Sequence, residues 1–487
     1  MEDFKNKAIR GIKWNFTEQV VVSFFTFAGT IVLSRILLPE HFGLFGMLTV
    51  LGNLATLIVG MGLSYSVINN QDLLPEDLST VFWFNLSLGF FMAAAFFFSA
   101  PFIAAFYHQP ELITITRLFS LGFIAQGANA VSVGLLIKFM KFNRLAVSNI
   151  SGTLFAYMAS VSLAFAGYGV WSLVVHFLVL HFVTVTVNLL MARWIPALDF
   201  RMSALHKVKK FSSHFLGSQL IDFTSNNLDS LLIGKYVGKR DLGFYGRATA
   251  LVTIPVTSLG YVLNRTLFPW FSALQNNIND LRFRYSQALK ILVLIIWPIL
   301  ILVGMQAEDV VVLLFGKPWI ESARYVMLLS VIAAFQSINA FNDSFLISQG
   351  RSDILLKISI VEKSLLIIGV IIGLKLGVAG IIIAKIIVLS LMIIPRIASI
   401  CHVIQTSLLQ WIRNLTPLLT GLVFMIATAW LTGQATQSIG YVIRLVLVSV
   451  TSLGVYYLYL IITRNSTLRE VRRLAGEQVK KLFFPHK

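Results

Sequence analysis

Residues 35–63 read RILLPEHFGLFGMLTVLGNLATLIVGMGL, and much of this stretch recurs two hundred residues further along the chain. The identical pairs are Gly43 and Gly243, Gly46 and Gly246, Thr49 and Thr249, Leu51 and Leu251, Gly60 and Gly260, and Leu63 and Leu263. At a spacing of 210 residues, a second stretch repeats Ser120, Gln126, Asn129, Ala130, Leu136 and Ile137 as Ser330, Gln336, Asn339, Ala340, Leu346 and Ile347. Because matching Gln and Asn residues cannot be credited to an apolar composition, the chain is an internal duplication.

The composition is that of a membrane protein. Of the 487 residues, 57% are hydrophobic and only 12% are charged. Many apolar runs reach the length of about 20 residues that a helix needs to cross a bilayer core of roughly 30 Å. Lipid cannot satisfy exposed backbone groups, and these runs lack the strict alternation of barrel strands. The sequence therefore predicts an all-α polytopic membrane protein.

We expect about fourteen transmembrane helices. Six are predicted in the first repeat, near residues 12–35, 42–68, 79–106, 112–137, 145–168 and 170–192. Six more are predicted near residues 212–236, 242–264, 285–305, 320–347, 354–374 and 378–400, and a last pair near 411–432 and 439–463. Because each repeat has six spans, both enter the membrane from the same side, as in transporters whose parallel repeats are related by an axis along the membrane normal.

The predicted organisation follows from this count. It consists of an N-lobe (1–192), a basic cytoplasmic linker (193–211), a C-lobe (212–400), two additional C-terminal helices (401–463) and a basic tail (464–487). We expect the tail segment 469–481 to form an amphipathic helix on anionic lipid headgroups, with protein docking as the alternative.

The distribution of charge predicts the orientation. Lys and Arg collect in alternate loops and at both ends of the chain, which places both termini in the cytoplasm. The net charge of +18 is explained in this way, and no basic stretch is interleaved with the stacking aromatics of a nucleic-acid site. The first segment has no small-residue cleavage site, which indicates an uncleaved first helix.

Enzymatic and metal-binding motifs are missing from the sequence. Cys401 is the single cysteine, so an internal disulfide and a multi-thiolate metal site are excluded. There is no P-loop, HExxH or GxSxG motif. We expect no enzyme, no metal site and no cofactor.

Polar residues on apolar spans are the first candidate site. Gln219, Asp222, Asn226 and Asp229 are spaced by 3, 4 and 3 residues, and Gln336, Asn339 and Asp343 by 3 and 4, so each set shares one helix face. Glu18 is a further acidic candidate, in the first span. Such a face either lines a water-filled cavity or bonds a neighbouring helix. Asp222 and Asp229 are candidates for coupling to protons or Na⁺.

Cationic residues form the second candidate site. Those away from obvious loop positions are Arg117, Arg247, Lys290, Arg324, Lys363 and Lys385. Together they favour an anionic substrate such as a phosphate. The alternative for each is a structural ion pair or a head that snorkels to the lipid headgroups. Snorkelling is the interpretation preferred for Lys138, Arg193, Lys235, Arg265, Arg396 and Arg464.

Several stretches are familiar when taken together. They are SRILLPEHFGLFGM (34–47), EDLSTVFWFNLSLG (76–89), APFIAAFYHQPEL (100–112), GYGVWSLV (167–174), NNLDSLLIGKYVGKRDLGFYGRA (226–248) and FGKPW (315–319). This ordered set resembles the Wzx-type polysaccharide exporters of the multidrug/oligosaccharidyl-lipid/polysaccharide (MOP) superfamily, in particular the colanic-acid-type branch. The resemblance covers nearly the whole chain, and its motif residues are mainly architectural.

The resemblance implies a two-lobed, fourteen-helix (MATE/MOP-like) protein of the bacterial inner membrane. It implies translocation of undecaprenyl-diphosphate-linked oligosaccharide repeat units by alternating access, with a cationic cavity, coupling to H⁺ or Na⁺, and a polysaccharide polymerase and chain-length regulator as partners. A lipid II flippase and a cation-coupled multidrug exporter of the same superfamily remain alternatives. A membrane glycosyltransferase would need a large outward loop, which the sequence lacks.

Overall fold

The computed structural model describes residues 2–60, 64, 67, 74–274, 277–465 and 467–469. Within these ranges the chain is helical, with turns between helices and no strand. The basic tail beyond residue 469 lies outside the described residues, as do the side chains of Asp222 and Arg265.

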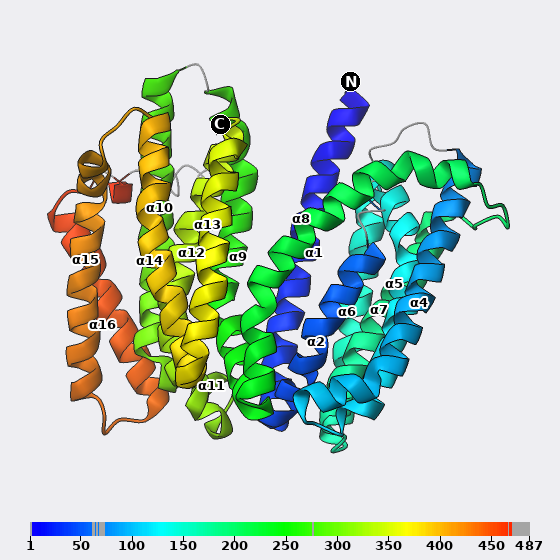
Figure 1. The fold of residues 1–487 in the computed structure, drawn as a ribbon. Coiled ribbons are helices and arrows are strands. Elements are labelled where there is room, and N and C mark those ends of the chain that lie inside the picture. The colour runs from blue at the N-terminus through cyan, green and yellow to red at the C-terminus, as the bar shows by residue number, and fades with distance from the viewer. Residues whose placement is uncertain are drawn as a thin grey trace, which may run out of the picture. The chain divides into compact units, whose positions relative to one another are not determined.

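Fourteen of the described helices are long, with 22 to 35 residues each. The first eight are α1 (Glu2–Ile36), α2 (Pro39–Gly60), α4 (Pro75–Tyr107), α5 (Leu112–Lys138), α6 (Phe142–Phe165), α7 (Val170–Ala192), α8 (Met202–Tyr236) and α9 (Lys239–Ala273) (Figure 1). The other six are α10 (Ile278–Met305), α12 (Ala323–Ser348), α13 (Ser352–Gly373), α14 (Gly377–Val403), α15 (Leu408–Ala435) and α16 (Tyr441–Ile462). Three short helices, α11 (Ala307–Leu314), η1 (Lys317–Ser322) and η2 (Leu374–Leu376), lie between them.

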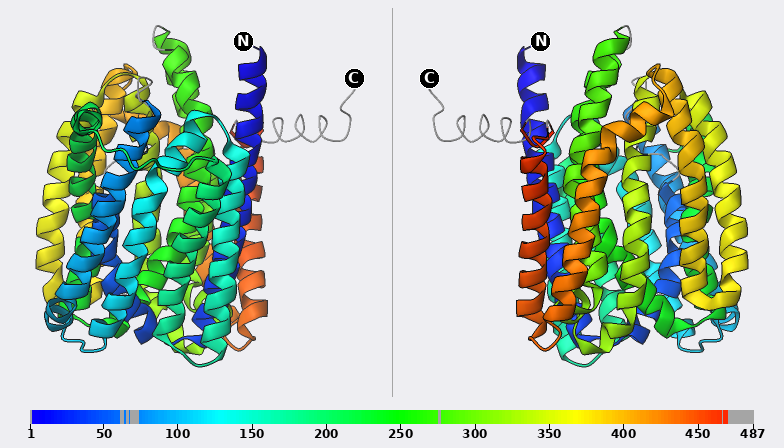
Figure 2. Two further views of the ribbon diagram at one scale, coloured as in Figure 1. Left: turned by 90° about the vertical axis from the view of Figure 1, so that its right-hand side faces the viewer. Right: turned by 90° about the vertical axis from the view of Figure 1, so that its left-hand side faces the viewer.

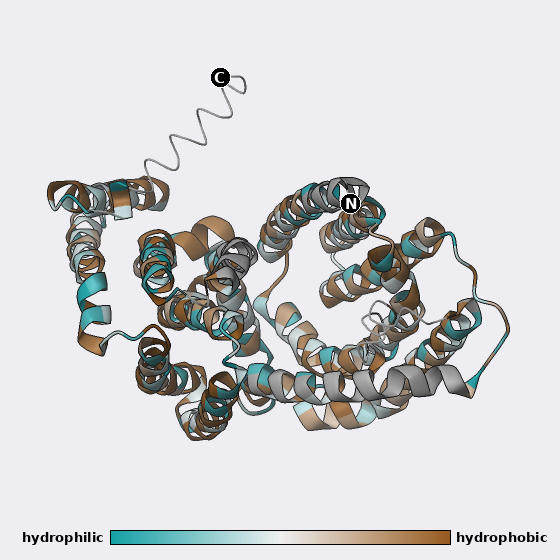
Figure 3. Cartoon of the chain, turned by 90° about the horizontal axis from the view of Figure 1, so that it is seen from above, coloured by the Kyte–Doolittle hydropathy of each residue, from teal (hydrophilic) through white to brown (hydrophobic). Residues whose placement is uncertain are grey.

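Length and hydropathy confirm the all-α polytopic fold. Ten stretches in the described part of the chain are long and apolar enough to cross a membrane, and one of them, Ser352–Val403, contains both α13 and α14. Large apolar side chains face outward: Phe98 is 74% exposed and Phe102 78% exposed. Figure 3 shows hydrophobic residues along the helices of the bundle. Exposed apolar surface of this kind is typical of a lipid-facing protein.

Two boundaries differ from the sequence prediction. The helix α8 begins at Met202, inside the segment predicted as a linker (193–211). The segment between the predicted spans 285–305 and 320–347 contains the helix α11 and the start of η1. Both segments are short of apolar residues or interrupted by Gly and Pro, which is why a search for apolar spans passes over them.

Contacts group the chain into two compact units, Met1–Gly246 (unit 1) and Arg247–Lys487 (unit 2). The division falls within α9, whereas the lobe boundary predicted from the duplication lies at 193–211. The predicted lobes follow the sequence repeat and stay a prediction.

In unit 1, α4 packs on α5 and α6 packs on both α7 and α1. The α4–α5 contact depends on two glycines: a Cβ at Gly89 would lie 3.2 Å from the Cα of Gly127. Next to them, Asn85 Nδ2 donates a 2.9 Å hydrogen bond to the carbonyl oxygen of Gly127. Small residues let helix backbones approach closely, so this pair fixes the crossing point.

In unit 2, α10 packs on α12 and α15, while α13 packs on α14. The helices α15 and α16 form an antiparallel pair (Figure 1, Figure 2). Helix starts are capped locally: Asn277 Oδ1 accepts from Asp280 N at 3.3 Å, and Ser407 Oγ accepts from Gln410 N at 3.1 Å. Such caps satisfy backbone donors at the start of α10 and α15.

Candidate functional site

Polar residues of α5 in unit 1 bond the neighbouring helix α7. The side chains of Gln126 and His181 lie 3.3 Å apart, and Asn188 Nδ2 donates to Asn129 Oδ1 at 2.9 Å. Gln126 and Asn129 belong to the duplicated sequence. In this half of the chain, they hold two helices together through hydrogen bonds in an apolar setting.

Glu18 on α1 also accepts a hydrogen bond from a neighbouring helix. Asn149 of α6 donates from Nδ2 to Glu18 Oε1 at 2.6 Å. The carboxyl group is half-buried. This contact joins α1 to α6, which pack along each other.

The polar face of α8 is not uniform. Asp229 is 3% exposed; its carboxyl accepts from Tyr245 Oη at 2.5 Å and from Ser230 N at 2.7 Å. Asn226 is exposed and Gln219 is half-buried. One member of the predicted face is thus buried and hydrogen-bonded to α9 and to its own helix. The role of the set in ion coupling stays a prediction.

The corresponding face of α12 in unit 2 also has mixed surroundings. Gln336 is exposed, whereas Asn339 is 8% exposed. Asn339 Oδ1 has no hydrogen-bond partner among the described residues. Asp343, one helical turn further along α12, forms an ion pair with an arginine.

That arginine, Arg396 on α14, is the centre of a buried ion cluster. Its side chain is 3% exposed and pairs with Asp343 of α12 and with Glu362 of α13, the second contact at 2.6 Å between Nη2 and Oε2. The expectation that Arg396 snorkels is wrong, because its helix turns the guanidinium inward between two carboxylates. A buried charge is stable only when it is paired in this way. The cluster ties three helices of unit 2 together.

The six predicted cations have different surroundings. Arg117 is exposed and lies 5.0 Å from the ring centre of Phe97. Arg324 is exposed and donates to Tyr325 Oη at 2.8 Å. The remaining four are half-buried, and each interacts with another group of the protein: Arg247, Lys290, Lys363 and Lys385. Their convergence on one lumen stays a prediction.

A hydrogen-bonded group in unit 2 was not anticipated from the sequence. Tyr285 Oη donates to Asn342 Oδ1 at 2.8 Å, and Trp411 Nε1 lies 3.4 Å from the same hydroxyl. Tyr285 and Asn342 are fully buried. Tyr and Trp are counted among the hydrophobic residues of the chain, so only the polar Asn342 beside Asp343 gave a signal in the sequence.

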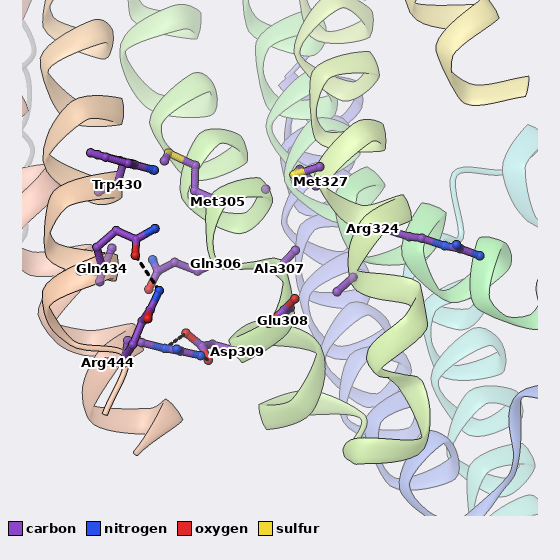
Figure 4. Close-up of a pocket in the computed structure, with 16 residues that line it drawn as sticks. Met305, Gln306, Ala307, Glu308, Asp309, Arg324, Met327, Trp430, Gln434 and Arg444 are labelled. Carbon is purple, nitrogen blue, oxygen red and sulfur yellow. Dashed lines mark hydrogen bonds and ion pairs between the residues drawn. The ribbon is translucent and has the colours of Figure 1, made fainter. Parts of the chain in front are cut away.

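A cavity of about 350 Å³ lies in unit 2 where α10 and α15 end (Figure 4). Asp309 of α11 is paired with Arg444 of α16, with Nε and Oδ2 2.6 Å apart and a second contact through Nη2. Near the end of α15, Gln437 donates to Gln434 Oε1 at 2.7 Å. The cavity is therefore polar at its centre.

No group of three or more His, Cys, Asp or Glu side chains placed to hold a metal ion occurs within the described ranges.

Comparison with known proteins gives a consistent result. The family described as "Polysaccharide biosynthesis protein" matches residues 32–324, more than half of the chain. The chain is 24% identical over 375 residues to the lipopolysaccharide biosynthesis protein WzxC of Escherichia coli (strain K12), covering 76% of this chain and 75% of that protein. It is 29% identical over 315 residues to the succinoglycan biosynthesis transport protein ExoT of Rhizobium meliloti (strain 1021), covering 64% of this chain but only 63% of that protein.

Among solved structures, the fold is similar to the lipid II flippase MurJ in an inward closed conformation. The TM-score is 0.75 at 13% sequence identity, covering 94% of this chain and 99% of that one. At this identity the likeness concerns the fold. The family match and the relative WzxC confirm the resemblance to Wzx-type polysaccharide biosynthesis proteins, and the likeness to MurJ confirms the helical fold.

Proposed function

The chain belongs to the polysaccharide biosynthesis protein family, and from this membership we propose that it is a flippase for undecaprenyl-diphosphate-linked oligosaccharide repeat units. It moves these units from the cytoplasmic to the periplasmic leaflet of a bacterial inner membrane, and both of its termini are cytoplasmic. The observation that carries the proposal is the family match over residues 32–324, together with relatives named for polysaccharide biosynthesis and transport.

The proposed mechanism is alternating access of the two repeats. Each repeat moves as a unit about the pseudo-axis along the membrane normal, so that one cavity opens first to the cytoplasm and then to the periplasm. The glycan diphosphate passes through this cavity while its isoprenoid tail stays in the bilayer. No bond is made or broken, so the chain acts as a transporter and not as an enzyme.

In the proposed mechanism, positively charged side chains recognise the diphosphate of the substrate. Arg and Lys side chains bind diphosphate oxygens through charge-assisted hydrogen bonds, which are strong where water is excluded. The candidates remain those singled out from the sequence: Arg117, Arg247, Lys290, Arg324, Lys363 and Lys385. Arg117 and Arg324 have exposed side chains, so a substrate can reach them without displacing other side chains.

Coupling to H⁺ or Na⁺ is assigned to buried carboxylates. Asp229 is supported by its burial and by the hydroxyl of Tyr245, which orients the carboxyl group. Asp343 and Glu362 share the guanidinium of Arg396, and the charge of Lys363 also acts on Glu362. A carboxylate within an apolar span is a natural candidate for binding a proton or a cation.

A lipid II flippase is the second candidate, favoured by the fold likeness to MurJ. Its cargo is also a diphosphate-linked glycolipid, so the polar residues of the chain do not separate the two. A cation-coupled multidrug exporter is disfavoured by the excess of basic over acidic residues in the apolar spans.

Deletion of the gene, followed by analysis of lipid-linked intermediates and surface polysaccharide, separates these functions. The proposal predicts loss of surface polysaccharide with accumulation of undecaprenyl-linked repeat units on the cytoplasmic side. Loss of peptidoglycan precursors from the periplasm would indicate a lipid II flippase instead. Unchanged glycan with altered drug tolerance would contradict the proposal. A polysaccharide polymerase and a chain-length regulator are the proposed partners downstream.

A further inference from the structure

A cavity of about 510 Å³ lies in unit 1, near the end of α1 that carries the N-terminus (Figure 1). It is formed where α1 meets the turn between α5 and α6. The residues that line it include Arg10, Gly11, Trp14, Phe139, Lys141 and Phe142. None of these residues is among those assigned to the cargo or to ion coupling.

The fold fixes the walls of this cavity. Gly11 is buried, and a Cβ there would lie 2.5 Å from Cδ2 of the Phe142 ring, so the missing side chain lets Phe142 pack against α1. The turn before Phe142 is held by a 2.8 Å hydrogen bond from Lys141 N to the carbonyl oxygen of Leu136, and Met140 within it has a left-handed conformation (φ 53°). The position of Lys141 beside α1 is therefore set by the backbone.

The lining carries an excess of positive charge. Arg10 is exposed and Lys141 is half-buried, with Nζ of Lys141 5.4 Å from the ring centre of Phe139. Within the part of the chain that the structure describes, no acidic side chain lines the cavity. Residues 138–144 include three basic residues and no acidic one. The acidic residues of α1 are at least seven positions from Arg10, which is about 10 Å along a helix. The cavity therefore favours an anion.

An exposed apolar surface begins next to the cavity. On α1, the side chains of Phe16, Val20 and Phe24 are each more than half exposed and recur every four residues, so they form one stripe along the helix, the apolar stripe. This stripe begins less than two turns beyond Arg10. Trp14, which is half-buried, lines the cavity between them. An indole between charged and apolar residues is typical of the membrane interface. A ligand that covers both surfaces has an anionic end and a hydrocarbon end.

We propose that this cavity binds the headgroup of one anionic glycerophospholipid, of which phosphatidylglycerol is the simplest. The phosphate lies between the Arg10 guanidinium and the Lys141 ammonium, which donate charge-assisted hydrogen bonds to it. The glycerol lies against Trp14, and an acyl chain extends along the apolar stripe of α1. The lipid thus links α1 to the turn between α5 and α6. The site lies within unit 1 and is separate from the cations assigned to the cargo.

Charge complementarity favours this lipid over other occupants. In a zwitterionic lipid, the choline or ammonium group would lie beside two cations with no carboxylate among the described lining residues, which is unfavourable at close range. Inorganic phosphate has the charge but no hydrocarbon to cover the apolar stripe. The diphosphate of the proposed cargo has similar chemistry, so undecaprenyl diphosphate is included in the experiment.

Removing both positive charges tests the site. The test variant is Arg10→Gln with Lys141→Gln, in which each new side chain is polar and no larger than the one it replaces, so the packing of α1 on α6 is kept. The matched control is Arg413→Gln, which removes an exposed cation near the start of α15 in unit 2.

The measurement is native mass spectrometry of the purified, delipidated full chain titrated with phosphatidylglycerol, phosphatidylcholine, inorganic phosphate or undecaprenyl diphosphate. We expect the wild type and Arg413→Gln to hold one phosphatidylglycerol in preference to phosphatidylcholine. In the double variant, binding of phosphatidylglycerol should weaken at least about tenfold, as for the loss of charge-assisted hydrogen bonds. Binding of undecaprenyl diphosphate should be the same in the wild type and in the double variant, because its proposed cations lie elsewhere.

Four results would overturn the proposal. Equal retention of phosphatidylglycerol and phosphatidylcholine by the wild type would refute the headgroup assignment, whether or not the double variant folds. Unchanged binding of phosphatidylglycerol in the double variant, or an equal loss in Arg413→Gln, would refute the site. Displacement of phosphatidylglycerol by equimolar inorganic phosphate would identify a soluble ion as the ligand. Loss of undecaprenyl diphosphate in the double variant would assign the cavity to the cargo.

Discussion

Gly43 and Gly243, which occupy equivalent positions in the two sequence repeats, pack reciprocally. A Cβ at Gly43 would lie 1.6 Å from the carbonyl oxygen of Lys239, and a Cβ at Gly243 would lie 2.0 Å from the carbonyl oxygen of Pro39. Pro39 and Lys239 are the first residues of α2 and α9, and they too are separated by the repeat spacing. The starts of these helices therefore meet in a contact that follows the symmetry of the duplication.

This contact has no room for a side chain. We expect Gly43→Ala and Gly243→Ala each to destabilise the protein by about 1–3 kcal/mol, because the added methyl group meets backbone that cannot turn aside. Thermal unfolding of the purified variants measures the effect. Gly246→Ala is the control, since a Cβ at this glycine of the same motif meets nothing within 4 Å. Equal melting temperatures for Gly43→Ala and Gly246→Ala would show that the close contact is not present in the protein.

The ion cluster around Arg396 predicts a large loss of stability. Arg396→Ala leaves Asp343 and Glu362, whose side chains are 34% and 14% exposed, without the cation that they share, which costs about 3 kcal/mol. The neutral combination Arg396→Met, Asp343→Asn and Glu362→Gln should restore most of the stability, because no charge is left unpaired.

The control for that experiment is the exposed ion pair of Arg351 and Asp353, whose side chains are 41% and 56% exposed. Arg351→Ala should cost less than about 1 kcal/mol. If thermal unfolding shows Arg396→Ala to be as stable as Arg351→Ala, then Arg396 reaches solvent and the cluster does not form.

Asp229 tests the proposed ion coupling. Asp229→Asn keeps an acceptor for Tyr245 but removes the charge, so we expect export of surface polysaccharide to fall about a hundredfold, the lower end of the effect typical of a proton-transfer group, at unchanged protein level. Tyr245→Phe removes the hydrogen bond and keeps the charge, and it should retain most of the export. The reverse ranking of the two variants would assign Asp229 a purely structural role.

Cysteine labelling tests the predicted orientation. Cys401, the single cysteine, is 4% exposed, so the wild type gives little background with a membrane-impermeant maleimide. Ser438→Cys lies in the exposed turn between α15 and α16, and Asn143→Cys lies at the exposed start of α6. With cytoplasmic termini, Ser438→Cys is labelled in intact cells and Asn143→Cys only after permeabilisation. The opposite pattern would invert the topology.

The sequence predicted the fold largely because a bilayer imposes simple rules. Apolar length predicted about fourteen spans; the described part of the chain has fourteen long helices, and ten stretches in it are long and apolar enough to cross a membrane. The repeated glycines indicated the duplication, and two of them, Gly43 and Gly243, lie in close contact. The helix α11 was missed because it is short and lies in a segment assigned to a loop.

The candidate site was less predictable, because it depends on how each helix is rotated about its axis. Arg396 was expected to snorkel, yet the rotation of α14 directs it between Asp343 and Glu362. Tyr285 and Trp411 bring polar atoms into the core of unit 2, although both are counted among the hydrophobic residues of the chain. Spacing along one helix identifies a shared face but does not identify what that face contacts.

The central claim is tested most directly by transport in proteoliposomes containing the purified chain and an undecaprenyl-diphosphate-linked oligosaccharide in both leaflets. A glycosidase added outside reports how much glycan reaches the outer leaflet. The account predicts that cleavage proceeds beyond the outer-leaflet fraction when the protein is present and stops at that fraction in protein-free liposomes. Cleavage that stops at the outer-leaflet fraction in both preparations would contradict the claim that this chain is a flippase for lipid-linked glycans.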